Sequence, residues 1–232
     1  LAAAINELKH AECDCAIIVA SEDGAVREAV ARAQNRKVPV MTLISDLPES
    51  KRRHFVGIDN IAAGRTAASL MGRFVGPRAK VAMIVGSMGL RDHRERFMGF
   101  HELCLDEFPS LDLIGPIEGF DDGHETAKRV IELLNHDPDI AGIYSMGAGN
   151  EGLIRALTRT GKAHRIRVIA HELSADTRQG LGNDTLDVVL DQDPEGEVRA
   201  AIAAARHLAV QPDGPVESSP IEIGIYLRDN LT

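Results

Sequence analysis

The sequence contains few cysteines and no long apolar run, and both absences narrow the class of protein. Its three cysteines, Cys13, Cys15 and Cys104, are an odd number, so they do not all pair within the chain. Free thiols in a reducing compartment are the simplest interpretation, because disulfides persist mainly in oxidising compartments. No apolar run reaches the ~20 residues that a membrane-spanning helix needs, and no signal peptide is visible.

Positive charge is also scarce. The 26 Lys and Arg are outnumbered by 35 Asp and Glu, which gives a formal net charge of -9 at pH 7. Phosphate binding relies on clustered Lys and Arg, so this balance argues against a nucleic-acid-binding surface within these residues. The charge of these residues says nothing about a DNA-binding module upstream of Leu1. Residues 1–13 resemble the second half of a helix and the first residue is not Met, so we expect sequence upstream.

Metal-binding and catalytic patterns are sparse as well. His10, Cys13 and Cys15 place three potential metal ligands within six residues, but no fourth ligand follows at a useful spacing. The pattern favours two cysteines that lead into a buried strand. The other histidines are scattered, and no Ser or Cys stands in a recognisable nucleophile turn. We therefore expect that the protein binds no metal or cofactor and is not an enzyme.

The sequence does contain a regular alternation of short apolar runs and helical spacing. The runs, typical of buried strands, cover residues 16–20, 38–44, 55–58, 80–85, 111–118, 140–146, 166–170, 186–190 and 221–227. Helices are predicted at 25–35, 60–74, 94–108, 123–134, 150–160, 175–181 and 195–210, and residues 211–220 form a Pro/Gly/Ser loop. Strands separated by helices predict parallel β-α-β units. The order restarts near Lys80, which predicts an α/β protein of two doubly wound lobes.

In such sheets ligands bind beyond the carboxyl ends of the strands. The loop from Gly147 to Gly152 follows a strand, opens a helix and matches the dinucleotide fingerprint, with Glu172 placed 20 residues beyond it as a ribose-binding acid. Against this, Glu151 competes for the positive helix end that a pyrophosphate needs. Two alternatives remain: the glycines let a ligand approach Asn150, or the loop is a turn that Asn150 caps.

Four more features follow strands. Glu172 is placed to accept two neighbouring hydroxyl groups of a polyol, or is an ordinary loop acid. The Gln192 side chain can both donate and accept hydrogen bonds, and it lies where the chain is expected to cross between the lobes. Arg91, Arg94 and Arg96 begin a helix, where basic residues oppose the dipole, so either one of them contacts the ligand or the cluster is a solvated helix start. Phe120 is suited to stack on a sugar face or to cover a neighbouring helix.

The stretches FVGIDNIAAGR (55–65) and RERFMGF (94–100), supported by VIAHE and VVLDQDP, resemble the periplasmic-binding-protein-like fold of LacI-type regulators and ribose-binding proteins. The resemblance covers essentially the whole chain. It implies that the ligand-binding residues are Arg96, Phe120, Asn150, Glu172 and Gln192. Two departures matter: GAGNEG replaces the usual N-D-x-x-A loop, which makes Asn150 a substitute, and the usual Asp after residues 38–44 is replaced by Ser45 or Asp46.

The resemblance also implies a first lobe that is incomplete at its N-terminus, because the family has a strand, a helix and a strand before the position of Leu1. The predicted first lobe holds residues 1–74 and 193–220, and the second holds residues 75–192 and 221–232. Our main functional interpretation is the effector-binding core of a cytoplasmic, homodimeric LacI-type transcription regulator or repressor. A small sugar-like effector would close the lobes and move an upstream headpiece on operator DNA.

Two other functions compete with the regulator. The alternative is a periplasmic sugar-binding protein of an ABC transporter, which the sequence upstream of Leu1 would distinguish by a signal peptide in place of a helix-turn-helix. The third is an NAD-dependent Rossmann enzyme, which rests on the Gly-rich loop alone.

Overall fold

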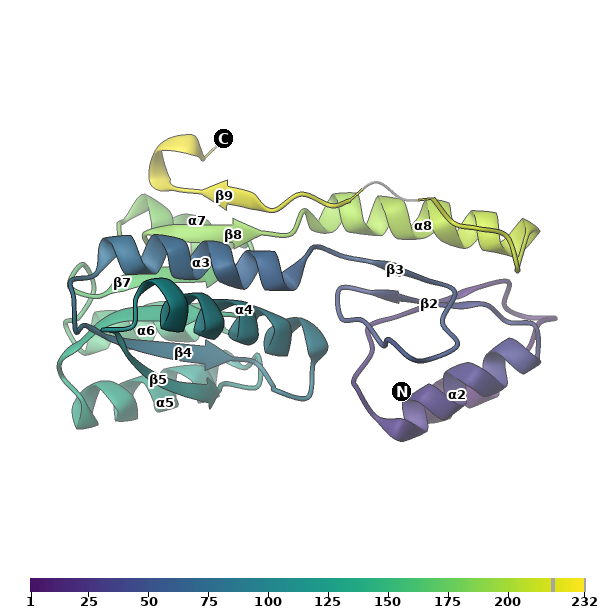
Figure 1. Cartoon of the computed structure of the whole chain (residues 1–232), viewed down its shortest axis with the longest axis horizontal. Helices are drawn as coiled ribbons and strands as arrows, with labels where there is room; N and C mark the ends of the chain where they lie inside the picture. The colour runs from purple at the N-terminus through teal and green to yellow at the C-terminus, as the bar shows by residue number, and fades with distance from the viewer. Residues whose placement is uncertain (218–219, 232) are drawn as a thin grey trace. The chain divides into compact units, whose positions relative to one another are not determined.

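The computed structural model describes residues 1–217 and 220–231 (Figure 1). Residues 218 and 219 of the predicted 211–220 loop, and residue 232, lie outside the described residues. The chain divides into two compact units. Unit 1 comprises residues 1–58, 89–92 and 192–222, and unit 2 comprises residues 59–88, 93–191 and 223–232.

Unit 1 is built on a parallel sheet of the order β1-β2-β3, formed by Ala16–Ile18, Val40–Leu43 and His54–Val56. The helices α1 (Ala2–Glu7) and α2 (Gly24–Asn35) share a core with this sheet that includes Ile5, Val30 and Val40. Helix α8 (Pro194–Val210) packs through Ala201, Ala204 and Leu208 on Met41 and Val56, which form a separate cluster. The small sheet is therefore covered by helices on two sides.

Unit 2 contains a six-stranded sheet of the order β5-β4-β6-β7-β8-β9. Its strands are β4 (Lys80–Val85), β5 (Asp112–Glu118), β6 (Ile140–Ser145), β7 (Arg167–His171), β8 (Val188–Asp191) and β9 (Gly224–Tyr226). All of the pairings are parallel except that of β9 with β8, which is antiparallel. The parallel strands end at one edge, where the order of β4, β5 and β6 reverses direction, and this is where ligands bind in such sheets.

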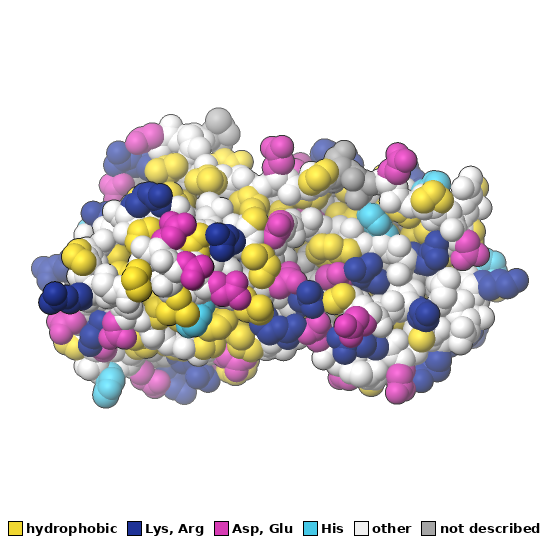
Figure 2. Space-filling model, viewed as in Figure 1, with side chains coloured by type: hydrophobic (Ala, Val, Ile, Leu, Met, Phe, Trp, Pro, Cys, Tyr) yellow, Lys and Arg dark blue, Asp and Glu magenta, His cyan; other side chains and the backbone are white. Residues whose placement is uncertain are grey.

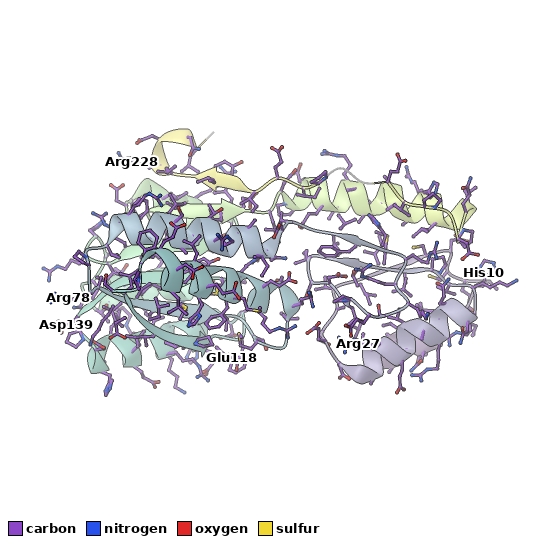
Figure 3. All side chains as sticks on the ribbon, in the orientation of Figure 1. His10, Arg27, Arg78, Glu118, Asp139 and Arg228 are labelled. Carbon is purple, nitrogen blue, oxygen red and sulfur yellow. The ribbon has the colours of Figure 1, made fainter. Side chains whose placement is uncertain are left out.

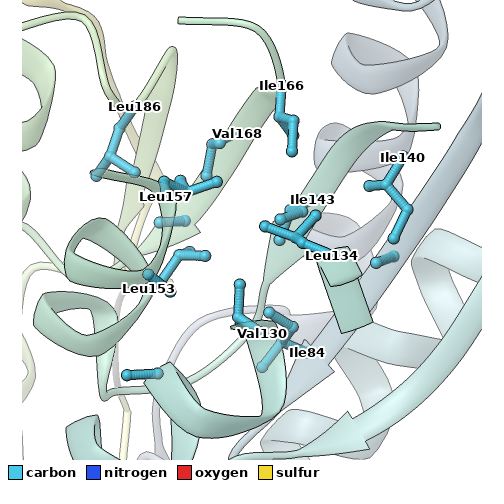
Figure 4. Close-up of a cluster of buried hydrophobic side chains, with 14 of the residues drawn as sticks. Ile84, Val130, Leu134, Ile140, Ile143, Leu153, Leu157, Ile166, Val168 and Leu186 are labelled. Atoms are coloured by element: carbon cyan, nitrogen blue, oxygen red, sulfur yellow. The ribbon is translucent and has the colours of Figure 1, made fainter. Parts of the chain in front are cut away.

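Helices cover both faces of the unit 2 sheet. On one face, α5 (Gly123–His136), α6 (Asn150–Arg159) and α7 (Ala175–Gly182) bury a cluster that includes Val130, Leu157 and Val168 (Figure 4). On the other face, α3 (Asn60–Phe74) and α4 (Arg91–Glu107) pack on Val81, Met83 and Tyr144. Strands buried on both faces explain the continuous apolar runs in the sequence, because neither side of such a strand meets water.

The helices begin where the sequence supplies side-chain caps. The Asp59 carboxylate accepts the N–H of Ala62 at 2.9 Å, and the Asp122 carboxylate accepts the N–H groups of His124 and Glu125, both at 2.8 Å. These bonds satisfy backbone donors that have no partner within the helix. The pKa of Asp122 lies below its usual value, first because of the bond from the Glu125 N–H, then because of the bond from the His124 N–H and the charges of His124 and Arg155.

The expected α/β class with parallel sheets is confirmed, and three local differences stand out. Helix α4 begins at Arg91 rather than Arg94. Helix α3 belongs to unit 2, whereas we expected it in the first lobe, because Ala67, Ala68 and Met71 pack into the cluster on the unit 2 sheet. Strand β9 covers only three residues of the predicted 221–227 run.

Candidate ligand-binding site

Arg96 is the most constrained of the predicted ligand-binding residues. Its side chain is only 1% exposed. Its Nε donates to Oδ1 of Asn60 at 2.8 Å, and its Nη1 donates to the backbone oxygen of Met146, which follows β6, at 2.7 Å. A guanidinium buried in this way needs hydrogen bonds to offset its lost hydration. Two bonds to two different elements fix the plane of the group at the carboxyl ends of the strands.

Asn150, at the start of α6, is 5% exposed and ties three segments together. Its Oδ1 accepts the hydroxyl of Ser145 at 2.8 Å, and its Nδ2 donates to the backbone oxygens of Gly147 and His171 at 3.1 and 3.0 Å. Both hydrogens of the amide are thus used within the protein. The loop after β6 and the end of β7 are held together by this side chain.

Beneath these groups lies a buried pair, Tyr144 on β6 and His171 on β7. The Tyr144 hydroxyl and His171 Nε2 are 2.8 Å apart and hydrogen-bonded, and the Tyr144 ring stacks on Phe100 with centroids 4.7 Å apart. Burial lowers the pKa of His171 well below its usual value, and the charges of Arg96 and His93 lower it further. His171 is therefore neutral at pH 7 and serves as a hydrogen-bonding partner without a charge.

Phe120 follows β5 and is 54% exposed. Phe120 and Asp121 both have left-handed backbone, with φ of 56° and 54°. The Asp121 carboxylate accepts the N–H of Ala148 at 2.8 Å, which joins the loop after β5 to the loop after β6. The Arg129 guanidinium lies 5.3 Å from the centre of the Phe120 ring, close enough for a cation–π contact. The side chain is thus largely exposed, and a cation lies over its ring.

Glu172 and Gln192 follow β7 and β8. Glu172 is half-buried with φ of 69°, its N–H donates to the Leu190 oxygen at 3.0 Å, and its own backbone oxygen accepts the Thr177 hydroxyl at 2.6 Å. These bonds hold the strained backbone that directs its carboxylate. Gln192 is 5% exposed and is the first residue of unit 1 after β8.

The other two arginines of the predicted cluster behave differently. Arg91 belongs to unit 1, where its Nη1 lies 3.1 Å from Oε1 of Glu22 and its backbone N–H donates to Oγ of Ser45 at 3.1 Å. Ser45 is buried, and its hydroxyl oxygen is the acceptor for this backbone bond from Arg91. Arg94 is partly exposed on α4. The structure thus separates the three arginines: Arg91 belongs to unit 1, whereas the Arg96 side chain is buried in unit 2 and bonded to Asn60 and Met146.

The Gly-rich loop is explained by packing. Gly149 has φ of 83° at the start of α6. A Cβ at Gly152 would lie 1.9 Å from the Gly123 oxygen, so this glycine permits α5 and α6 to touch. Dinucleotide fingerprints need glycines for approach to a pyrophosphate, whereas Gly152 is needed here for contact between two helices.

Several polar residues of the site were not singled out from the sequence. Asn60 lies at the first turn of α3, where it resembles a helix cap. The buried His93 accepts the Ser87 N–H on Nδ1 at 3.1 Å, and the Glu118 carboxylate at the end of β5 (Figure 3) accepts the Met88 N–H at 2.8 Å. The position of each after a strand or at a helix start was the available signal, but only the fold brings them to one edge of the sheet.

The described residues contain no cluster that could hold a metal ion and no helix long and apolar enough to cross a membrane. All three cysteines are free. Burial raises the pKa of the Cys104 thiol to about 12, and burial together with Cys13 raises that of Cys15 to about 11.

A family model described as "periplasmic binding protein domain" matches residues 2–212, so the chain belongs to this family. Among curated relatives, the ribose import binding protein of Bacillus subtilis is 27% identical over 205 residues, 87% of this chain and 65% of that protein. Its Salmonella typhimurium counterpart is 24% identical and matches 77% of this chain and 60% of its own length. The chain thus spans less than two thirds of the relatives it matches.

Solved structures agree on the fold. A solute-binding protein of an ABC transporter from Burkholderia graminis, in complex with D-arabinose, has a TM-score of 0.92 at 23% identity and covers 99% of this chain and 80% of its own. A glucose-galactose binding protein from Geobacillus stearothermophilus has a TM-score of 0.90 at 19% identity, with 99% and 82% covered. The periplasmic-binding-protein-like α/β fold is therefore confirmed. The matched proteins are binding proteins, not enzymes.

The expected LacI-type regulator is wrong, because the matched relatives are import binding proteins. The expectations of transcription regulation, DNA binding, repression and a cytoplasmic location are corrected with it. The cytoplasmic location was inferred from the free cysteines. Burial raises the pKa of Cys15 and Cys104 and makes them poor nucleophiles, so their free state is no evidence for a reducing compartment. In Figure 2 acidic and basic side chains are interspersed on the visible face, with no gathering of Lys and Arg.

Proposed function

We propose that this chain binds a small sugar and acts as the solute-binding component of a sugar importer. The observation that carries the proposal is the buried Arg96 guanidinium, held by Asn60 and Met146 at the carboxyl ends of parallel strands. A guanidinium offers fixed donors to the oxygens of a polyol or its derivatives. The exposed Phe120 ring supplies an apolar face of the kind that stacks on a sugar.

The proposed ligand-binding residues are Arg96, Phe120, Asn150, Glu172 and Gln192. Asn150 acts mainly by holding the loop after β6, since both of its amide hydrogens are bonded within the protein. The Glu172 carboxylate accepts sugar hydroxyls from the end of β7. Support for a monosaccharide comes from relatives named for ribose import and from structural neighbours with D-arabinose or D-fucose bound. The predicted homodimer stays a prediction.

Thermal unfolding with and without sugars tests the function. We expect at least one of D-ribose, D-arabinose, D-fucose, D-glucose and D-galactose to stabilise the protein saturably, because a ligand at 100 times its Kd adds about 2.7 kcal/mol to the unfolding free energy. The L-enantiomer of the same sugar is the matched control for solvent effects. A response that is absent for the whole panel, or equal for both enantiomers, would contradict the proposal.

Variants then test the site. Arg96→Ala and Glu172→Ala are each expected to abolish the sugar-induced stabilisation while the protein remains folded by circular dichroism. Arg206→Ala, at an exposed position of α8, is the matched control and should respond as the wild type does. An unchanged sugar response in both site variants would exclude this site. Arg96→Lys keeps the charge but not the planar fork, so it separates loss of charge from loss of geometry.

A further inference from the structure

We propose that Asn60 is a positioning residue for Arg96 and that a close contact between α3 and α4 at Gly64 and Gly99 sets the distance between them. The proposal rests on the proposed function, because it concerns how the sugar-binding arginine is oriented. Neither Asn60 nor the two glycines needs to touch a sugar.

Asn60 is buried against Arg96 and bonded to it. Its side chain is 3% exposed, and its Oδ1 accepts Nε of Arg96 at 2.8 Å. The helix cap at this position is already supplied by Asp59, whose carboxylate accepts the Ala62 N–H at 2.9 Å. Asn60 therefore does not serve as the N-cap of α3. Its side-chain oxygen instead accepts the hydrogen bond from Arg96.

The two helices that carry this pair touch through their backbones. A Cβ added at Gly64 would lie 2.1 Å from the backbone oxygen of Arg96 itself, and one added at Gly99 would lie 2.2 Å from the backbone oxygen of Ile61. Real Cβ atoms do not come that close to backbone, so any larger residue at either position forces the helices apart. Gly64 lies one turn after Asn60, and Gly99 lies one turn after Arg96, so the contact sets the separation of the bonded pair.

The consequence is a guanidinium whose orientation is fixed before a ligand arrives. Nε is held by α3 and Nη1 is held by the Met146 oxygen after β6, which together define the direction of the remaining N–H groups. An arginine side chain ordered in advance loses less conformational entropy on binding, and this saving appears as affinity. If Asn60 only satisfied a buried donor, its removal would lower stability and leave affinity unchanged.

The first experiment compares Asn60→Ala with the near-isosteric Asn60→Asp, which keeps an oxygen acceptor for Nε. Titration calorimetry with D-ribose and D-arabinose should show an affinity weaker by roughly tenfold in Asn60→Ala, or about 1.4 kcal/mol, and close to wild type in Asn60→Asp. Equal loss in both variants, or no loss in Asn60→Ala, would overturn the positioning role.

A second readout needs no sugar. In ¹⁵N-correlated NMR spectra the Arg96 Nε–H, assigned by its absence in Arg96→Lys, should give a slowly exchanging signal in the wild type and in Asn60→Asp. The signal should be broadened or lost in Asn60→Ala. A signal that persists unchanged in Asn60→Ala would overturn the inference. If no sugar binds the wild type but the NMR pattern holds, the proposed function fails and the Asn60–Arg96 geometry stands.

The helix contact is tested with Gly64→Ala against Gly76→Ala, since a Cβ at Gly76 meets nothing within 4 Å. Only Gly64→Ala should weaken sugar binding and perturb the Nε–H signal. In an Arg96→Lys background, which lacks Nε, Asn60→Ala should produce no further loss of affinity. Additive losses in that double variant, or equal effects of the two glycine substitutions, would contradict the proposal.

Discussion

The two units of the chain use polar side chains in different ways. In unit 2, Asn60, Arg96, Asn150 and His171 are at most 5% exposed and are hydrogen-bonded at the carboxyl ends of the strands. In unit 1, Arg52 donates to the Asp46 carboxylate through two bonds of 2.5 and 2.7 Å, and both side chains remain partly exposed. The buried Thr42 hydroxyl donates to the same carboxylate at 2.7 Å.

The two sheets also differ in how many of their strands are buried. Unit 2 has four central strands that are mostly buried, β4, β6, β7 and β8, whereas unit 1 has one, β2. The outer strands of both sheets are more exposed: Ile17 in β1 is 38% exposed and Ile225 in β9 is 42% exposed. Burying polar groups is costly unless every one is hydrogen-bonded. Unit 1 also buries single polar side chains, such as Thr42 and Ser45, but four of the five candidate site residues lie in unit 2.

The largest expected effect comes from Phe100→Ala, which removes a ring that is 0% exposed and stacked on Tyr144. Loss of a buried aromatic side chain costs about 3–5 kcal/mol. Hydrogen–deuterium exchange should show faster exchange in β4 and β6. The counterpart in unit 1, Leu208→Ala, should cost about 2–5 kcal/mol and accelerate exchange in β2 and β3. If either variant accelerates both units equally, the two cores are not separate.

A smaller effect is expected from pH, through His171. Its folded pKa lies well below the usual value, so between about pH 6.5 and that lower pKa the unfolded chain binds a proton that the folded chain does not. Stability is therefore complete above about pH 6.5 and falls on acidification, by up to about 1.4 kcal/mol per pH unit for this one proton.

Urea unfolding between pH 5 and 8 measures this dependence, and His171→Gln should flatten it while offering Tyr144 a hydrogen-bonding partner. His54 in unit 1 is the comparison, because its pKa is also lowered, by burial first and by the charge of Arg52 second. His136→Gln, at an exposed position, is the control. A pH profile that His171→Gln leaves unchanged would show that the buried histidine does not contribute.

The smallest effect is chemical and leaves stability unchanged. Because burial raises the pKa of Cys104 to about 12 and that of Cys15 to about 11, neither forms much thiolate at pH 7.5. Iodoacetamide should modify Cys104, in unit 2, only on unfolding, and Cys15, in unit 1, slowly. Cys15→Ser should remove the slow native-state phase. Rapid modification of Cys104 in the folded protein would contradict its burial.

The order and type of the elements from β1 onward could be predicted from the sequence, and some of their limits as well. The run KVAMIV gave β4 with its observed limits, and helical spacing after Asp59 gave α3 from Asn60 to Phe74. These succeeded because buried parallel strands are continuous apolar runs and caps are local. The predicted start of α4 was three residues late, because a basic residue such as Arg91 opposes the helix dipole at an N-terminus. In the structure Arg91 is held there by Glu22 and Ser45, which are distant in sequence.

The sequence alone determined the α/β class and the polar residues that follow the strands, and the family resemblance selected Arg96 from three neighbouring arginines. Only the tertiary structure decided that Arg96 is held by Asn60, that Asn150 ties β6 to β7, and that Arg91 belongs to the other unit. The physical reason is the range of the interactions. Periodicity and caps act over a few residues, whereas the bond from Arg96 to Asn60 joins positions 36 residues apart on two helices that meet at glycines.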